Sequence, residues 1–285
     1  DFVLEEGVKG TKEIALLNAD VALQAKEGCS LSPDGSVVFT KEDLKTKLLG
    51  MAIEFCNEDL NGKMTQVLNV LGLKRQNGQL PAGLEDILMA YLGRLLQKKA
   101  QRLVVLGDTA SSDAELALMD GMLKIIENSN EVNSITVPYA TIDATNAYDI
   151  ATALYGAVPA EVFDNGMDVK IYTGRTEAMA ILAQWNQANP YNQVDNPTAM
   201  GTFEFTLPLF GITVVSVPEL TGQNVMWALP MSLWFLGTDL EEDFSFDIKY
   251  DDYNDKLKAE ASFRLGVAGV WKQYSTKVEL NGTPS

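Results

Sequence analysis

The sequence predicts a mixed α+β fold in which long antiparallel strands, one long helix and an alternating α/β unit occupy separate parts of the chain. Apolar residues recur at helical spacing over 81–106, and apolar and polar residues alternate over 244–250 and 257–267. Strand and helix patterns alternate over 134–217. The chain has 285 residues, of which 46% are hydrophobic, which is enough for a buried core and about two domains or sub-domains.

Gly7–Lys12 is interpreted as part of a flexible arm. The stretch Gly7–Lys12 superficially resembles a phosphate-binding loop, but the G-x-x-x-x-G-K-[ST] spacing is absent and no strand is predicted before it. The sequence begins at Asp1 and lacks the basic, apolar and small-residue segments of a secretory signal. We therefore interpret its start either as a trimmed end or as a site of proteolytic maturation.

Glu13–Phe55 is predicted to form a long hairpin-like excursion made of short extended pieces. Extended pieces over Ile14–Leu23 and Val37–Phe39 flank the turn sequence Ser32–Gly35. The apolar content of this region is too low for a core of its own. We therefore expect the hairpin to need another surface on which to lie.

A long helix is predicted over 81–106, and Pro81 suits its first turn. Its apolar face repeats at the i, i+3, i+4 and i+7 positions through Leu84, Ile87, Leu88, Tyr91, Leu92, Leu95 and Leu96. At 1.5 Å per residue this helix would be about 40 Å long, which suits a spine for the molecule. Gly107 and Asp108 end it, and a second helix is predicted over Ala114–Ile126.

The alternating unit is followed by the clearest strand pattern in the chain. In the unit we predict strands at Ser134–Val137, Val169–Tyr172, Phe203–Leu207 and Ile212–Val217, and helices at Ala147–Leu154 and Arg175–Trp185. After it, 244–250 and 257–267 are predicted to form a long antiparallel hairpin with one buried face, joined by the polar run 251–255.

Composition excludes several classes of chemistry. The chain contains no histidine, which excludes Ser-His-Asp and Cys-His nucleophiles and most catalytic zinc sites. The two cysteines, Cys29 and Cys56, are too far apart for a C-x-x-C motif; free thiols are favoured, and one disulfide remains open. The formal charge of -17 argues against tight wrapping of a nucleic-acid backbone. No stretch approaches the ~20 apolar residues of a membrane span, so we predict no membrane partner.

Two clusters of acidic residues are candidate metal-binding or catalytic sites. The first contains Asp239, Glu241, Glu242 and Asp243, and the second contains Asp251, Asp252 and Asp255. Carboxylates of this kind bind divalent metals or act as glycosidase pairs. Their spacing does not match the calcium loop D-x-[DN]-x-[DN]-G, and turn or helix-start roles are favoured. Gly266–Gly269 lies in or just after a predicted strand, which excludes a dinucleotide fingerprint. Core positions are predicted for Trp185, Trp227, Trp234 and Trp271.

The order of these parts resembles the major capsid proteins of tailed double-stranded DNA bacteriophages, the Hong Kong phage type of shell fold. The resemblance rests on a series of short motifs taken in order: Phe55–Leu60, Leu80–Asp108 with its Leu-Gly-Asp end, Asp120–Lys124, Asp168–Tyr172, Phe210–Ile212 leading into Val217–Leu220, Leu236–Leu240 and Phe263–Val267. The match as a whole spans most of the chain in order, from about Thr11 to Val278.

The resemblance implies a division of the chain and a function. It implies an N-terminal arm at 1–12, an extended hairpin loop at 13–60, a peripheral domain at 61–133 and 221–285, and an inserted axial domain at 134–220. It implies a non-enzymatic protein that assembles with copies of itself into pentamers and hexamers of an icosahedral shell enclosing double-stranded DNA. Portal, scaffolding and decoration proteins are the other implied partners, and the expected location is the virion, assembled in the bacterial host cytoplasm.

Two other functions remain open at this point. An encapsulin-type nanocompartment shell shares the fold, and a histidine-free carboxylate hydrolase would use the acidic region Asp239–Asp255. Some members of the resembled family form Lys–Asn isopeptide bonds, but no motif aligns Lys41, Lys45 or Lys47 with Asn254 as a reacting pair. We assign no catalytic, cofactor-binding or metal-binding residue, and no cofactor.

Overall fold

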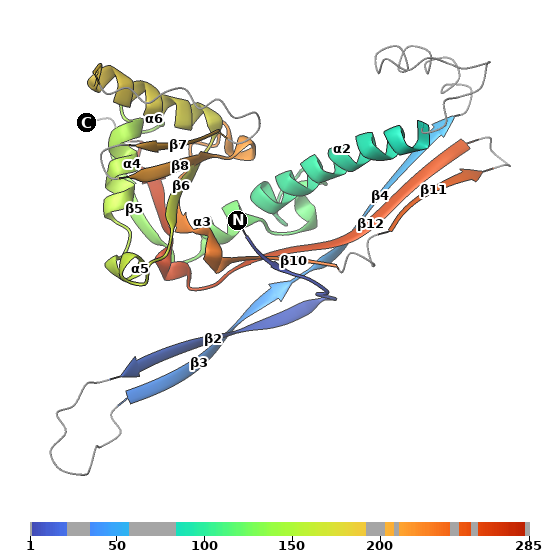
Figure 1. Ribbon diagram of the computed structural model, residues 1–285, viewed down its shortest axis with the longest axis horizontal. Helices are drawn as coiled ribbons and strands as arrows, with labels where there is room; N and C mark the ends of the chain where they lie inside the picture. The colour runs from blue at the N-terminus through green and yellow to red at the C-terminus, as the bar shows by residue number, and fades with distance from the viewer. Residues whose placement is uncertain are drawn as a thin grey trace, which may run out of the picture.

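Two larger sheets, a two-stranded sheet and one long helix form the framework of the described residues, with shorter helices packed on it (Figure 1). The computed structural model describes residues 2–21, 35–56, 84–191, 203–207, 211–239, 245–251 and 256–282. Figure 1 shows an α/β part on the left, a long helix above long strands on the right, and a two-stranded hairpin projecting below them. The mixed α+β class predicted from the sequence is confirmed.

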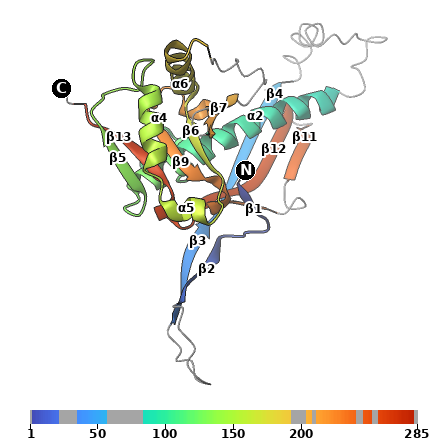
Figure 2. The same cartoon turned by 60° about the vertical axis from the view of Figure 1, so that its left-hand side comes forward.

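The α/β part contains a six-stranded mixed sheet in the order β5-β13-β9-β6-β8-β7. Its strands are β5 (Asn133–Val137), β6 (Val169–Thr173), β7 (Phe203–Leu207), β8 (Ile212–Ser216), β9 (Met226–Pro230) and β13 (Thr276–Leu280). Helices α4 (Ala147–Gly156) and α6 (Arg175–Ala188) pack against each other beside it, and the short helix α5 (Ala160–Asp164) lies near them (Figure 2).

The two central strands of this sheet, β9 and β6, are buried on both faces. In β9, Met226 and Ala228 pack into a core with residues of α4 and α6, whereas Trp227 and Leu229 pack into a second core with the end of the long helix. Successive side chains of a strand point to opposite faces, so one short strand contributes to both cores. The sheet therefore joins the α/β part to the rest of the molecule.

The second sheet is built around the longest strand, β12 (Lys256–Gly269). Strand β4 (Lys47–Cys56) runs antiparallel along one edge of β12. Strands β10 (Trp234–Thr238) and β11 (Ser245–Asp251) follow one another along the other edge. Strand β1 (Val3–Glu5) adds to β10 in parallel. The predicted C-terminal hairpin of β11 and β12 is confirmed.

Helix α2 (Leu84–Leu106) is the predicted long helix, and its predicted end at Leu106 is confirmed. Its 23 residues give a length of about 35 Å. The buried side chains Leu92 and Leu103 are eleven residues apart and so lie on one face of the helix, and Val104 is buried beside that face. This helix packs against β12 and α3, and Figure 1 shows it running above the long strands.

The single helix predicted over Ala114–Ile126 is wrong. The structure has a short 3-10 helix, Leu116–Leu118, followed by an extended residue at Met119 and then by α3 (Met122–Asn128). The break has a steric cause at Gly121, whose N–H donates to the carbonyl of Gly107 at 2.8 Å. The chain crosses the end of α2 there, and a continuous helix would leave no room for that crossing.

The elements predicted for the α/β unit are all present, with ends within two or three residues of the prediction. Strands β1, β9, β10 and β13 were not predicted. All five residues of β9 are buried, so the strand lacks the alternating pattern that identifies a strand with one solvent face. Three short 3-10 helices, Pro218–Leu220, Met231–Leu233 and Lys272–Tyr274, make further connections.

The interpretation of Gly7–Lys12 as part of a flexible arm is also wrong. Val8 is only 3% exposed, and its N–H donates to the carbonyl of Thr238 at 3.2 Å. The residues before it form β1, and Thr11 and Lys12 begin the next strand. This segment is therefore fixed to the edge of the second sheet.

Three of the predicted core tryptophans, Trp185, Trp227 and Trp234, are buried. Trp271 is half-buried at positive φ and packs against the second core. Gly266–Gly269 lies within β12, as expected. Among the described helices, none has the length and apolar character needed to cross a membrane.

Three strands lie across the divisions that the resemblance implies. Strand β4, within 13–60, pairs with β12 along its whole length. Strands β9 and β13, within 221–285, belong to the sheet of the α/β unit. The sheets therefore interlock regions that are separate in the sequence.

Candidate interaction surfaces

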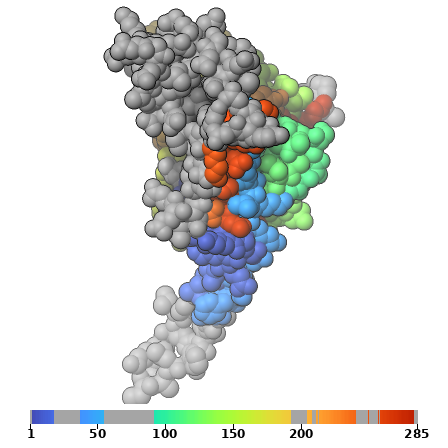
Figure 3. All heavy atoms as spheres, turned by 90° about the vertical axis from the view of Figure 1, so that its right-hand side faces the viewer, coloured from blue at the N-terminus to red at the C-terminus, as the bar shows by residue number. Residues whose placement is uncertain are grey.

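Strands β2 (Thr11–Val21) and β3 (Gly35–Lys45) form a hairpin that projects from the body of the molecule (Figure 3). Leu17 and Phe39 are cross-strand partners and are 54% and 74% exposed. Val37 lies on the same face as Phe39 and Val38 on the opposite face, and both are more than half exposed. We call the three residues that share one face, Leu17, Val37 and Phe39, the apolar strip. Because an isolated two-stranded hairpin is marginal in water, the strip is a surface that needs a partner.

The root of the hairpin, in contrast, is packed on the body. Leu44 is fully buried in a small cluster with Val8 and Ala268. Glu42 of β3 forms an ion pair with Lys272, which lies after β12. The projecting part of the hairpin thus begins from a fixed base.

The lysines considered for cross-linking lie in or beside this root. Lys41 forms an ion pair with Glu13 on the facing strand, and the hydrogen bond between them raises the pKa of Lys41 above its usual value. Lys45 ends β3 and Lys47 begins β4. Asn254 lies outside the described residues, as does Cys29; Cys56 ends β4, and its side chain is not among those described.

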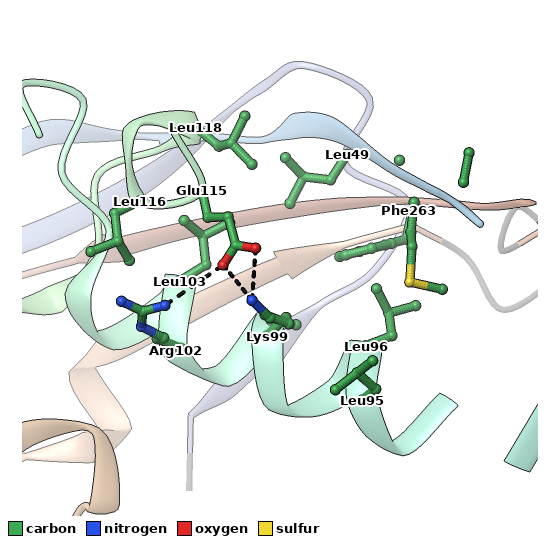
Figure 4. Close-up of a pocket in the computed structure, with 14 residues that line it drawn as sticks. Leu49, Leu95, Leu96, Lys99, Arg102, Leu103, Glu115, Leu116, Leu118 and Phe263 are labelled. Carbon is green, nitrogen blue, oxygen red and sulfur yellow. Dashed lines mark hydrogen bonds and ion pairs between the residues drawn. The ribbon is translucent and has the colours of Figure 1, made fainter. Parts of the chain in front are cut away.

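A groove of about 370 Å³ lies between α2, β4 and the segment after α2 (Figure 4). Its apolar lining includes Leu49 from β4, Leu95 and Leu103 from α2, Leu118 and Phe263. Leu95 and Leu118 are both more than a third exposed. The groove is therefore a second apolar surface, placed on the body instead of on the hairpin.

The groove has a charged rim. Glu115 accepts hydrogen bonds from Lys99 at 2.5 and 2.7 Å and lies 3.6 Å from Arg102 (Figure 4). Arg102 also pairs with Asp113 at 3.2 Å. All four side chains are about half exposed, so these pairs add little stability. They fix the position of the segment after α2 across the helix.

The acidic clusters are only partly within the described residues. Asp239 is buried and lies 3.6 Å from Arg264, and Asp251 is paired with Lys256 in the β11–β12 ladder. The remaining members, Glu241, Glu242, Asp243, Asp252 and Asp255, lie outside them. Within the described part of the chain, no group of three or more Cys, Asp or Glu residues is placed to hold a metal ion.

Ionisable groups outside the hairpin and the groove form ion pairs or are buried within the subunit. Lys124 of α3 bridges Asp108 and Asp120 at 2.6 and 2.9 Å, and its hydrogen bond lowers the pKa of Asp108. Burial raises the pKa of Tyr172 to about 12. Each of these groups is explained by the packing or the ion pairs around it.

Comparison with known proteins identifies the fold. No protein-family model and no curated protein sequence matches the chain. Among solved structures, the capsid of an empty GTA particle has a TM-score of 0.64 at 11% identity, covering 99% of this chain and 88% of that chain. The satellite phage P4 procapsid gives 0.60 at 10% identity, with 98% and 93% covered, and the mature capsid of bacteriophage PhiM1 gives 0.54 at 14% identity, with 99% and 86% covered. The chain has the phage capsid fold.

The resemblance inferred from the order of motifs is thus confirmed at the level of the fold. The sequence predicts that the hairpin needs another surface on which to lie, but it does not identify the residues of the apolar strip. The groove was not anticipated. Its lining comes from β4, α2, β12 and the segment after α2, and no single stretch of sequence carries a pattern for it.

Proposed function

We propose that this protein is a major capsid protein that assembles with copies of itself into a closed shell. The observation that carries the proposal is the apolar strip, which lies on a hairpin too far from the body to be covered by its own subunit. Burial of Phe39 and its neighbours on a second copy would remove apolar surface from water, the main driving force of association. The capsid fold supports the same assignment.

The proposal includes the finer features that the family resemblance implies. The subunits form pentamers and hexamers of an icosahedral shell, with 134–220 as the axial domain, 61–133 and 221–285 as the peripheral domain, and 13–60 as the extended loop. The strip and the groove lie on different parts of one molecule, and contacts between unlike surfaces are the kind that build rings and larger closed assemblies.

The shell is proposed to enclose double-stranded DNA without holding it tightly. A chain with 39 acidic and 22 basic residues repels phosphates on average, which suits a container from which DNA is later released. Portal, scaffolding and decoration proteins are the proposed partners, assembly is proposed to occur in the host cytoplasm, and the role is structural, without catalysis. No feature of the described residues favours the encapsulin-type alternative. The hydrolase alternative is weakened because Asp239 is buried beside Arg264.

Electron microscopy and sedimentation velocity of the purified full-length chain test this function. We expect closed particles far larger than one subunit, together with rings of five or six subunits under conditions that dissociate them. A protein that stays strictly monomeric at all protein concentrations, ionic strengths and temperatures tested would contradict the proposal.

A further inference from the structure

The root of the β2–β3 hairpin lies on a pair of glycines. Gly237 of β10 and Gly266 of β12 are direct cross-strand partners, so the sheet carries no side chain at these adjoining positions. Lys45 and Thr46, the end of β3 and the only residue between β3 and β4, lie against this bare patch. We call Thr46 and the two glycines the hairpin seat.

The fit between the root and the glycines is tight. A Cβ atom at Gly266 would be 2.2 Å from the carbonyl oxygen of Lys45 and 2.9 Å from the Cα atom of Thr46. A Cβ atom at Gly237 would be 2.7 Å from the Cγ2 atom of Thr46. The contacts at Gly266 are with backbone atoms, which cannot move aside as a flexible side chain can. Any residue larger than glycine at position 266 would therefore displace the root itself.

Thr46 also binds the segment that enters the hairpin from the other side. Its hydroxyl donates to the carbonyl of Val8 at 2.7 Å and accepts from the N–H of Gly10 at 3.2 Å, and its own N–H donates to the carbonyl of Gly10 at 2.7 Å. Gly10 has a φ of +110°, a conformation that other residues rarely adopt. Thr46 is 7% exposed, so these bonds are shielded from water. One threonine thus ties the segment just before β2 to the junction between β3 and β4.

Small rotations at such a root have large effects at the hairpin tip. Strands of 11 residues extend about 36 Å from the root. A rotation of about 10° at the root would move Val37 and Phe39, which lie about 23–30 Å along the strand from Thr46, by about 4–5 Å. This is as large as the 4–4.5 Å over which apolar side chains make contact. The position of the apolar strip relative to a second copy therefore depends on how firmly the root is held.

We propose that Thr46 and the Gly237–Gly266 pair are positioning residues that fix the direction of the hairpin and so place the apolar strip for assembly. This inference rests on the proposed function, because it assigns the seat a role in subunit contact. A seat that only stabilised the subunit would show its effect in unfolding and leave the hairpin direction unchanged.

The test compares four variants in the full-length chain. Thr46→Val keeps the shape of the side chain and removes the hydroxyl, whereas Thr46→Ser keeps the hydroxyl. Gly266→Ala places a methyl group against the root. Gly50→Ala is the matched control in the neighbouring strand β4, since its Cβ atom would lie at an ordinary 3.7 Å from the carbonyl of Ala261.

Hairpin direction is measured in the unassembled subunit by the distance between two nitroxide labels. The labels are placed on Thr40→Cys in β3 and Ser134→Cys in β5, both at exposed positions, with Cys29→Ser and Cys56→Ser removing the natural thiols. We expect one narrow distance for the parent, Thr46→Ser and Gly50→Ala, and a shifted or broadened one for Thr46→Val and Gly266→Ala. If Gly266→Ala does not fold, Thr46→Val decides alone. An unchanged distance in a folded Thr46→Val protein overturns the proposal.

Assembly is measured on the same variants without labels, by particle yield and diameter in electron microscopy. We expect Thr46→Val to reduce closed particles at least tenfold or to change their diameter, with Thr46→Ser restoring them. A shifted hairpin with normal particles would overturn the role in assembly. If the parent chain itself forms no particles, the proposed function fails, while the label distance still decides whether the seat directs the hairpin.

Discussion

Gly121 shows how a single missing side chain allows two segments of this fold to cross. A Cβ atom there would lie 2.6 Å from the backbone nitrogen of Gly107 and 2.7 Å from the carbonyl oxygen of Val104. The sequence indicates a helix through this position, because the apolar residues of Ala114–Ile126 do recur at helical spacing. The pattern could not show that the chain has to pass within contact distance of the end of α2, because that constraint comes from tertiary packing.

Replacing Gly121 by alanine is therefore expected to destabilise the subunit by about 1–3 kcal/mol, the usual cost of forcing a methyl group into a closely packed site. Gly93 is the matched control, since it lies within α2 with open space around its Cβ position. Gly93→Ala is expected to stabilise by about 0.5–1 kcal/mol, because alanine is the better helix former. Urea denaturation of the unassembled subunit measures both changes. Equal effects of the two substitutions would contradict the steric explanation.

At the scale of elements, the pairing of β4 with β12 holds the second sheet together. Glu54 of β4 lies 2.9 Å from Lys256 and 3.5 Å from Lys258 of β12. The hydrogen bond from Lys256, followed by the attraction of its charge, lowers the pKa of Glu54 below its usual 4.5. A carboxylate whose pKa is lower in the folded state adds stability above its unfolded pKa. That contribution is lost as the pH falls through the lower, folded-state value.

The subunit should accordingly lose stability below about pH 4.5, and Glu54→Gln should make that loss less steep. The measurement is the urea midpoint of unfolding between about pH 3 and pH 6. Glu131→Gln serves as a control, because Glu131 has no ion pair among the described residues. The role assigned to Glu54 would be refuted by parallel pH curves for the parent and Glu54→Gln.

Elements with a strong local pattern were predictable and those without one were not. The long helix to Leu106 and the β11–β12 hairpin follow from periodicity alone. Strand β9 was not predicted, because burial on both faces removes the alternation of apolar and polar residues that identifies a strand. The hairpin seat was not predicted, because it requires Gly237 and Gly266 to lie opposite each other. The sequence of neither segment determines the register between two distant strands.

At the scale of the whole molecule, the apolar strip is a surface that a single subunit does not bury. Leu17 and Phe39 make few contacts to lose within the subunit, so replacing both by threonine, which suits a strand, should leave its thermal unfolding midpoint nearly unchanged. Particle formation should fall by roughly tenfold or more, since buried aromatic anchors carry much of the energy of protein contacts.

Thr40→Ser, a polar change in the same hairpin, is the control for this pair and should assemble like the parent. Particle yield by sedimentation and microscopy, read beside thermal unfolding, separates assembly from stability. Normal particles from the doubly substituted chain would show that the apolar strip does not contribute to the contact between subunits. The groove beside α2 would then be the remaining candidate surface.

The continuity of β3 and β4 has a mechanical consequence. Only Thr46 separates the projecting strand from the one that lies along β12, so a pull on the hairpin passes directly into β4. Strand β4 is paired with β12 over ten residues and runs along the direction of that pull. Such a force loads the rungs of the ladder together in shear, instead of opening them one after another. A neighbour bound to the hairpin would thus pull on the whole β4–β12 ladder at once, so the junction would resist tension between subunits.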